Sequence, residues 1–300
     1  MRAALAYSPR PGPLGGARPS IAAVYLGPLA VISFSFSSPA VLLSCGLTAI
    51  GIAWASGALR PALAPLRYGV TLAITVVVVN VIVSQRGDTI LVRGFELPVI
   101  GQVDVTLEAL AEGGILALRI LVALLVFAVW SACVDPDRIL KAIRPFAARS
   151  ALTATLISRL VPLAAADSMR LQEAASLRGP AAAEAGRAAI ARRLVAGALE
   201  RSVEVAATLE LRGFGLGGRP TRVRHARVPG EPAMVISGLL TAVLVIAAWA
   251  AGAGTIETYP LISGGLEAET LAFALLIPVA AALPFLSPVQ LRRLRAEAAR

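Results

Sequence analysis

The sequence has few charged residues and almost no lysine, histidine or cysteine. Of its 300 residues, 15% are charged, two are cysteines, one is a histidine (His225) and one is a lysine (Lys141). One histidine is too few for a histidine-based metal cluster. The lysine follows Leu140 without a preceding run of glycines, so the sequence has no phosphate-binding loop. We therefore expect a non-enzymatic chain with no catalytic residue, no metal site and no bound cofactor, which takes its energy from another polypeptide.

The residues present in excess are apolar. Hydrophobic residues make up 57% of the chain, and the mean hydropathy is +0.77. Soluble domains are nearer half apolar and a quarter charged. The excess lies in long runs, and a helix needs ~17–20 residues to cross a hydrocarbon core of about 30 Å. The sequence therefore predicts an all-α polytopic membrane protein with about six transmembrane helices. The apolar runs are residues 21–36, 40–59, 68–84, 113–133, 233–252 and 270–286.

The distribution of arginine predicts the orientation of the chain. With both termini in the cytoplasm, all basic residues except Arg86, Arg93 and Arg119 fall in cytoplasmic segments. This bias is the usual one for membrane proteins, whose cytoplasmic loops are rich in Lys and Arg. The predicted parts are an N-terminal cytoplasmic tail (1–20), four transmembrane helices (21–133), a cytoplasmic segment (134–232), and two further transmembrane helices with a basic tail (233–300).

The first apolar run is the weakest of the six. It contains Pro28 and ends in a Ser- and Phe-rich stretch before Pro39, so the first two runs could form a tight helical hairpin. A signal peptide is a competing interpretation, because Arg2, Arg10 and Arg18 precede the run. No small-residue cleavage site follows, which argues against it. The sequence leaves open whether this run crosses the membrane completely.

The cytoplasmic segment is too long for a plain loop, and its pattern is helical. Asp135-Pro136-Asp137 predicts a helix start, because proline and acidic residues favour the first turn. Amphipathic periodicity then predicts two long helices, at about 150–177 and 187–211. Pro162 is expected to kink the first of them. In the second, Arg201 is expected on the polar side, opposite the apolar stripe.

The two predicted helices end in the same way. Taken singly, each ending is an ordinary C-cap, with Arg near the negative end of the helix dipole and Gly just beyond it. Two such endings on long helices would instead present two guanidinium groups beneath the membrane. Arg makes planar, bidentate contacts with carboxylates, which favours docking onto two equivalent acidic grooves of a partner. The endings are Leu177-Arg178-Gly179 and Leu211-Arg212-Gly213.

At these motifs the chain resembles the transmembrane T component of energy-coupling factor (ECF) transporters, ABC-type importers of vitamins and transition-metal ions in bacteria. Members of that family end two cytoplasmic coupling helices with Ala-Arg-Gly, and here Leu stands in the Ala position both times. Arg159 and Pro162 are similar to the family's Arg-x-x-Pro stretch. The basic residues Arg219 and Arg222 resemble its basic tail. The likeness extends over residues 65–225, whereas residues 1–20 show none.

The resemblance implies a transmembrane scaffold and coupling subunit. The two Leu-Arg-Gly motifs would dock two cytoplasmic ATPase subunits, which bind the ATP, and Arg159 and Pro162 would support the first coupling helix. A separate membrane substrate-capture (S) subunit would be the other protein partner, within the lipid bilayer. The implied location is the bacterial plasma membrane. The resemblance does not indicate which vitamin or metal ion, such as cobalt, is taken up.

Two polar residues fall inside predicted spans. Arg119 lies six residues into the fourth span, where a charge is costly and often marks function. It could also reach the interface, with Glu108 or Glu112 as partner. Asn80 lies in the third span, and an interhelical hydrogen bond is the role expected of it.

Three other interpretations compete with the scaffold. A self-sufficient permease would hold the substrate itself. A membrane-anchored binding protein would use the basic segment around Arg219–Arg227 to bind nucleic acid or anionic lipid. No aromatic stacking platform accompanies that segment, so we expect no nucleic-acid partner. A membrane enzyme would need a cluster of polar side chains on one helix face, which the sequence does not show.

Overall fold

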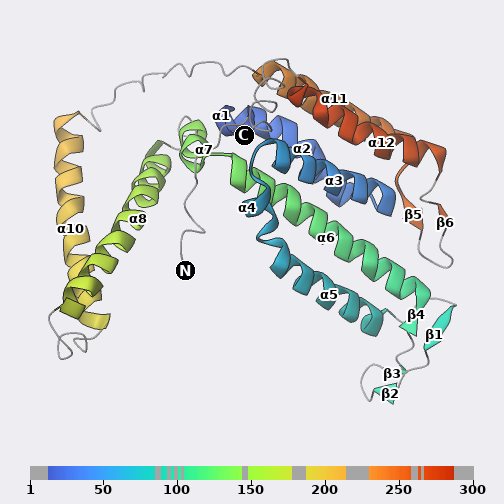
Figure 1. Ribbon diagram of the computed structural model, residues 1–300, viewed down its shortest axis with the longest axis horizontal. Helices are drawn as coiled ribbons and strands as arrows, with labels where there is room; N and C mark the ends of the chain where they lie inside the picture. The colour runs from blue at the N-terminus through green and yellow to red at the C-terminus, as the bar shows by residue number, and fades with distance from the viewer. Residues whose placement is uncertain are drawn as a thin grey trace. The chain divides into compact units, whose positions relative to one another are not determined.

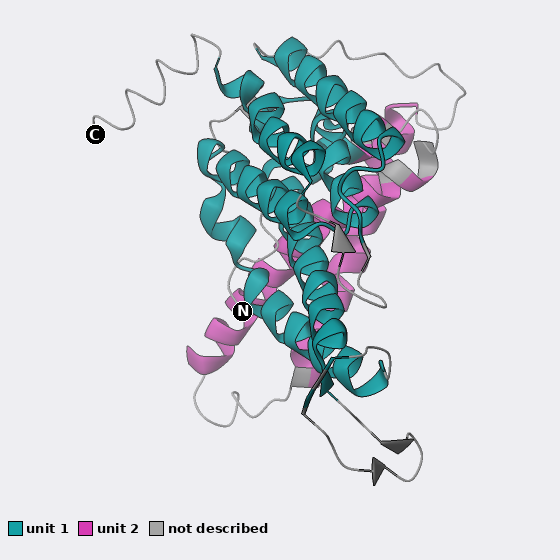
Figure 2. Ribbon diagram, turned by 90° about the vertical axis from the view of Figure 1, so that its right-hand side faces the viewer, with its two compact units in different colours: residues 1–139, 227–300 teal, residues 140–226 magenta. Residues whose placement is uncertain are grey.

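The computed structural model divides the chain into two compact units (Figure 2). The membrane unit comprises residues 1–139 and 227–300, and the arm unit comprises residues 140–226. The structure describes residues 13–84, 89–92, 96–97, 101–102, 105–143, 148–177, 187–213, 230–257, 263–264 and 267–286.

The membrane unit consists of apolar helices that pack side by side (Figure 1). Within the residues that the structure describes, four helical segments are long and apolar enough to cross a membrane: Leu59–Val83, Leu107–Cys133, Glu231–Ala250 and Ala268–Phe285. The predicted all-α polytopic membrane fold is thereby confirmed. The helices are α1 (Pro13–Gly16), α2 (Pro19–Ser35), α3 (Pro39–Ala55), α4 (Leu59–Leu63), α5 (Leu66–Val83), α6 (Leu107–Cys133), α11 (Glu231–Ala250), α12 (Ala268–Ala282) and the 3₁₀ turn η1 (Leu283–Phe285).

The first two apolar runs form a short helical hairpin. Helices α2 and α3 have 17 residues each, which makes each about 25 Å long. Residues 36–38 join them, and Pro28 lies inside α2, which continues past it. Both helices fall below the length of the four membrane-crossing segments.

The core of the membrane unit lies between α2, α3, α6, α11 and α12. Helix α11 packs against α2, and α12 packs against α3, whereas α5 lies along α6 (Figure 1). Tyr25, Ile32 and Leu42 are among the largest buried side chains. Cys45 and Cys133 are free thiols that are also buried in this core.

Glycine permits the close approach of α11 to α2. A Cβ atom added to Gly238 would lie 2.3 Å from the backbone oxygen of Val24. Small residues at helix interfaces allow such backbone proximity in membrane proteins, where packing contributes much of the helix association.

Two parts of the membrane unit differ from the sequence-based expectation. Helix α6 begins six residues before the apolar run at 113, because Thr106 Oγ1 accepts a hydrogen bond from Ala109 N at 3.3 Å and caps the helix. Residues 60–67, which separate the second and third apolar runs, are mostly helical, since they contain most of α4 and the start of α5. The connections between helices also contain short antiparallel pairs that the sequence did not indicate. These are β1 (Ile90–Val92) with β4 (Val105–Thr106), β2 (Glu96–Leu97) with β3 (Gly101–Gln102), and β5 (Ile256–Glu257) with β6 (Ser263–Gly264).

The helices predicted after α6 are present near the expected positions. Helix α7 (Pro136–Ile143) begins where Asp135 Oδ1 accepts a hydrogen bond from Asp137 N at 2.9 Å. Helices α8 (Ala148–Leu177) and α10 (Arg187–Leu211) are the two long amphipathic helices, and both lie in the arm unit. Helix α8 runs through Pro162 without interruption.

The close approach at Gly238 predicts a stability difference between two Gly→Ala variants. Gly238→Ala should lower the free energy of unfolding by about 1–3 kcal/mol, because the new methyl group overlaps backbone atoms of α2. Gly27→Ala is the matched control, since no atom lies within 4 Å of its added Cβ. Thermal unfolding of the purified variants in detergent, followed by circular dichroism, measures the difference. Equal midpoints would contradict the tight α2–α11 contact.

Candidate functional site

A partly exposed ion pair joins the two long helices of the arm unit. Arg201 Nη2 of α10 donates a hydrogen bond to Asp167 Oδ2 of α8 at 2.9 Å. Both side chains are about one quarter to one third exposed, with values of 34% for Arg201 and 24% for Asp167. Arg170 Nη1 also lies 3.7 Å from Asp167 Oδ1. The contact fixes where the two helices meet.

The ion pair lies at equivalent positions of the two helices. Asp167 and Arg201 are 34 residues apart in sequence, as are Leu177 and Leu211, the last residues of α8 and α10. Each helix therefore extends ten residues beyond the ion pair, or ~15 Å at 1.5 Å per residue. Leu177 and Leu211 thus lie equally far along their helices from the ion pair.

The structure corrects the predicted face of Arg201. The sequence pattern placed it opposite the apolar stripe of α10. Arg201 instead belongs to a row of less exposed residues with helical spacing, and it pairs with α8. Val195, Leu199 and Val203 of the same helix are exposed. An ion pair across a helix contact can keep a charged residue on the inner face, which hydrophobic periodicity alone cannot reveal. The row on α10 is Ile190, Leu194, Gly197, Arg201, Val205 and Leu209.

The second motif has the geometry of a left-handed C-cap. Gly213 has φ 73°, and its N–H donates to the carbonyl oxygen of Glu210 at 2.9 Å. The predicted cap is confirmed here. Leu211 is 88% exposed, and Arg212 is exposed beside it. The end of α10 therefore presents an apolar side chain and a guanidinium group together.

The first motif is described only up to its leucine. Leu177 ends α8 and is 88% exposed, as Leu211 is on α10. Arg178 and Gly179 lie outside the described residues, as do Arg219 and Arg222 of the basic tail.

Arg159 and Pro162, the two residues predicted to support the first coupling helix, both lie on α8 and are exposed. They are one turn apart and precede the ion pair at Asp167. Their surfaces are available for contact, and their supporting role stays a prediction.

Arg119 binds the break between α2 and α3. Its Nη2 donates to the carbonyl oxygen of Phe36 at 3.1 Å and to Ser37 Oγ at 3.0 Å. Phe36 is the C-cap of α2, so a positive charge lies at the negative end of that helix dipole. Within the described part of the chain, Arg119 Nε is buried without a hydrogen-bond partner. The contacts to Phe36 and Ser37 replace the predicted pairing with Glu108 or Glu112.

Asn80 lies against α6 but does not make the expected hydrogen bond through its side-chain oxygen. A Cβ atom added to Gly113 would lie 3.2 Å from the Cβ of Asn80. Asn80 Oδ1 is buried, and no described residue donates to it. At Asn80 the structure therefore shows close packing of α5 against α6.

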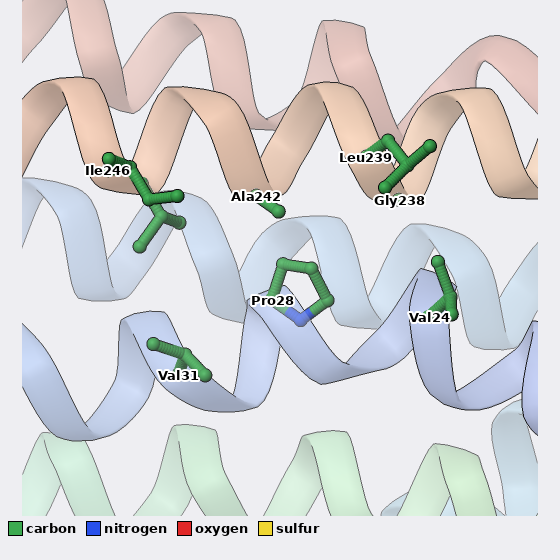
Figure 3. Close-up of a pocket in the computed structure, with 8 residues that line it drawn as sticks. Val24, Pro28, Val31, Gly238, Leu239, Ala242 and Ile246 are labelled. Atoms are coloured by element: carbon green, nitrogen blue, oxygen red, sulfur yellow. The ribbon is translucent and has the colours of Figure 1, made fainter.

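An apolar groove lies between α2 and α11 (Figure 3). Its volume is about 410 Å³, and Pro28 of α2 and Ala242 of α11 face it from opposite sides. The other lining residues are Val24, Val31, Gly238, Leu239, Val245 and Ile246. Among the residues that the structure describes, no three His, Cys, Asp or Glu side chains gather where they could hold a metal ion.

The fold and the two long helices of the arm unit define a class of protein. It is the class of polytopic membrane proteins in which a separate helical unit carries two similar motifs. The chain matches the model of the CbiQ family, described as cobalt transport protein, over residues 14–223. The chain therefore belongs to this family, which is the family of ECF transporter T components, and the predicted resemblance is confirmed. The match begins earlier than the likeness seen in the sequence and includes α2 and α3. No curated protein sequence matches the chain significantly.

The contacts of Arg119 predict a stabilising role. Arg119→Leu should lower the free energy of unfolding by about 1.5–3 kcal/mol, because a charged hydrogen bond to the end of α2 is lost. Arg67→Leu is the control. Arg67 donates a hydrogen bond only to the neighbouring Tyr68 hydroxyl among the described contacts, and Tyr68 is exposed on the outside of α5. The control should change stability by less than about 0.5 kcal/mol. Denaturation in detergent measures both, and similar losses for the two variants would contradict the capping role.

Proposed function

We propose that the chain is the transmembrane T component of an ECF-type importer. In this role it transmits the motion of two cytoplasmic ATPase subunits to a separate membrane substrate-capture subunit, for uptake of a vitamin or a transition-metal ion. Membership of the cobalt transport family supports a role in transport. The observation that carries the specific role is the pair of exposed motif ends at equal distances from the Asp167–Arg201 ion pair.

The equal arms suit two equivalent docking sites. The described motif end offers Leu211 for an apolar contact and Arg212 for a carboxylate, while Gly213 turns the chain away. A guanidinium beside an apolar side chain combines directional hydrogen bonds with burial of surface. Two copies of one ATPase, or two related ATPases, could receive the two ends in the same way.

ATP binding is assigned to the partners. The sequence contains no phosphate-binding loop, and the proposed subunit has no catalytic residue and no cofactor of its own. We also propose a multi-pass location in the bacterial plasma membrane with both termini cytoplasmic, which the arginine distribution supports.

The exposed apolar residues of the arms suit contact with the capture subunit. Val195, Leu199 and Val203 form an exposed row on α10, and Ile157 and Val161 are exposed on α8. Exposed apolar patches of this kind mark protein or membrane contacts. The alternative of a self-sufficient permease gains no support from the groove between α2 and α11, because its lining is apolar.

The docking role predicts a charge-reversal effect. Arg178→Glu and Arg212→Glu should each reduce recovery of the ATPases with the tagged chain, and the double variant should nearly abolish it. The expected loss is about tenfold or more, as for removal of one partner of a close charge pair in an interface. Arg193→Glu is the control, because Arg193 is an exposed arginine of α10 outside the motif.

Affinity purification from mild detergent with stoichiometry by mass spectrometry measures this recovery. Undiminished recovery with the double variant would overturn the docking role. Recovery of the native chain alone, with a tightly bound small molecule, would favour the permease.

The left-handed cap predicts a second effect on assembly. Gly213→Val should reduce recovery of the ATPases, because φ 73° is costly for a β-branched residue and the end of α10 would change direction. Ala196→Val on the same helix is the control, since Ala196 is exposed and lies outside the row that faces α8. The same purification compares the two variants. Equal recovery would show that the turn at Gly213 is not needed for docking.

A further inference from the structure

The membrane unit continues into the arm unit at two places. The first root is residues 134–139, from the end of α6 into α7, and the second root is residues 230–234, the start of α11. Both roots contact residues 14–18, which we name the strap. The strap precedes α2 and belongs to the membrane unit, as do both roots.

The strap contacts the second root through Glu231. Arg18 N donates to Glu231 Oε1 at 3.3 Å, and Arg18 Nε lies 3.8 Å from the same oxygen. The Glu231 side chain is only 7% exposed, so this acid depends on its partners within the protein. Arg18 is the N-cap of α2, and Glu231 lies in the first turn of α11. One carboxylate thus lies at the positive ends of two helix dipoles.

The strap contacts the first root through Arg138. Arg138 Nη1 donates to the carbonyl oxygen of Gly16, the last residue of α1. Arg138 Nε also lies 3.7 Å from Asp135 Oδ2, whose other carboxylate oxygen caps α7. The guanidinium therefore connects the end of α1 to the beginning of α7.

Apolar contacts fix the strap to the same core as both roots. Leu14 and Ala17 of the strap are buried, as are Val134 of the first root and Met234 of the second. All four side chains belong to the hydrophobic core of the membrane unit. The strap is thus a packed element and not a free tail.

We propose that the strap joins the two roots into one base, with Arg18, Arg138 and Glu231 as positioning residues. Without the strap, each root could bend independently of the other. A movement of the arm unit would then bend the roots and would not reach the membrane helices. With both roots held by one segment, the movement reaches α6 and α11 together. The meaning of this device for transport rests on the proposed function, whereas the joining of the roots does not.

The test is hydrogen–deuterium exchange of the full-length chain in lipid nanodiscs, with mass spectrometry of peptides from both roots. Arg18→Glu should speed amide exchange about tenfold in the second root and, because the strap is shared, also in the first. Glu231→Arg should act in the same way. Arg67→Glu is the control with the same charge change on an exposed arginine.

Two results would overturn the proposal. One is faster exchange in the second root alone, and the other is single variants that exchange no faster than Arg67→Glu. If Arg18→Glu does not fold, Glu231→Gln replaces it, since the amide oxygen still accepts from Arg18 N while the charge is lost. Exchange in both roots should then rise by a smaller factor, and unchanged exchange would overturn the strap.

A second readout separates this proposal from the proposed function. Arg18→Glu should leave recovery of the ATPases unchanged, because the docking motifs lie in the arm unit. Failure of the Arg178→Glu and Arg212→Glu pair to reduce recovery would overturn docking and leave the exchange result standing. Loss of recovery with Arg18→Glu would overturn the view that the strap acts separately from docking.

Discussion

The hydrogen bonds at the break between α2 and α3 permit a helical hairpin to turn within an apolar bundle. Backbone groups that leave a helix at membrane depth need partners from the protein, because the hydrocarbon supplies none. Ser37 N and Ser38 N both donate to the carbonyl oxygen of Gly254 at 3.0 Å, and Arg119 donates to the carbonyl oxygen of Phe36. The turn after α11 and Arg119 of α6 thereby hold the tip of the hairpin.

The same contacts give the tip its fixed geometry. Gly254 has φ 81°, and an added Cβ would lie 2.5 Å from the ring of Phe36. Its N–H donates to Thr270 Oγ1 of α12 at 3.0 Å. Phe36 also packs on Phe273 with ring centroids 5.1 Å apart. Two hairpins, α2–α3 and α11–α12, are therefore joined at their tips by backbone hydrogen bonds, and the Phe36 ring leaves no room for a side chain at Gly254.

The sequence predicted what depends on local pattern and missed what depends on distant partners. Long apolar runs and amphipathic periodicity are local, so the existence of the long helices was predicted. The boundaries of α8 and α10 were predicted to within about two residues. The extra turns of α6 were missed because the cap at Thr106 precedes the apolar run. The sequence shows Arg119 as a charge in a span, yet its partner Phe36 lies 83 residues away. The strap contacts, across 122 and 213 residues, carry no signal in a single sequence.

The unequal lengths of the helices have a consequence for the surrounding lipid. Helix α6 has 27 residues and a length of about 40 Å, whereas α2 has 17 residues and is about 25 Å long. Val31 and Phe34 of α2 are exposed on the outside of the bundle, where lipid would contact them. A bilayer adapts to a short apolar helix by thinning, at a cost of fractions of a kcal/mol per Å. The membrane beside α2 is therefore expected to be thinner than elsewhere around the protein, and a neighbouring membrane protein would tilt more easily there.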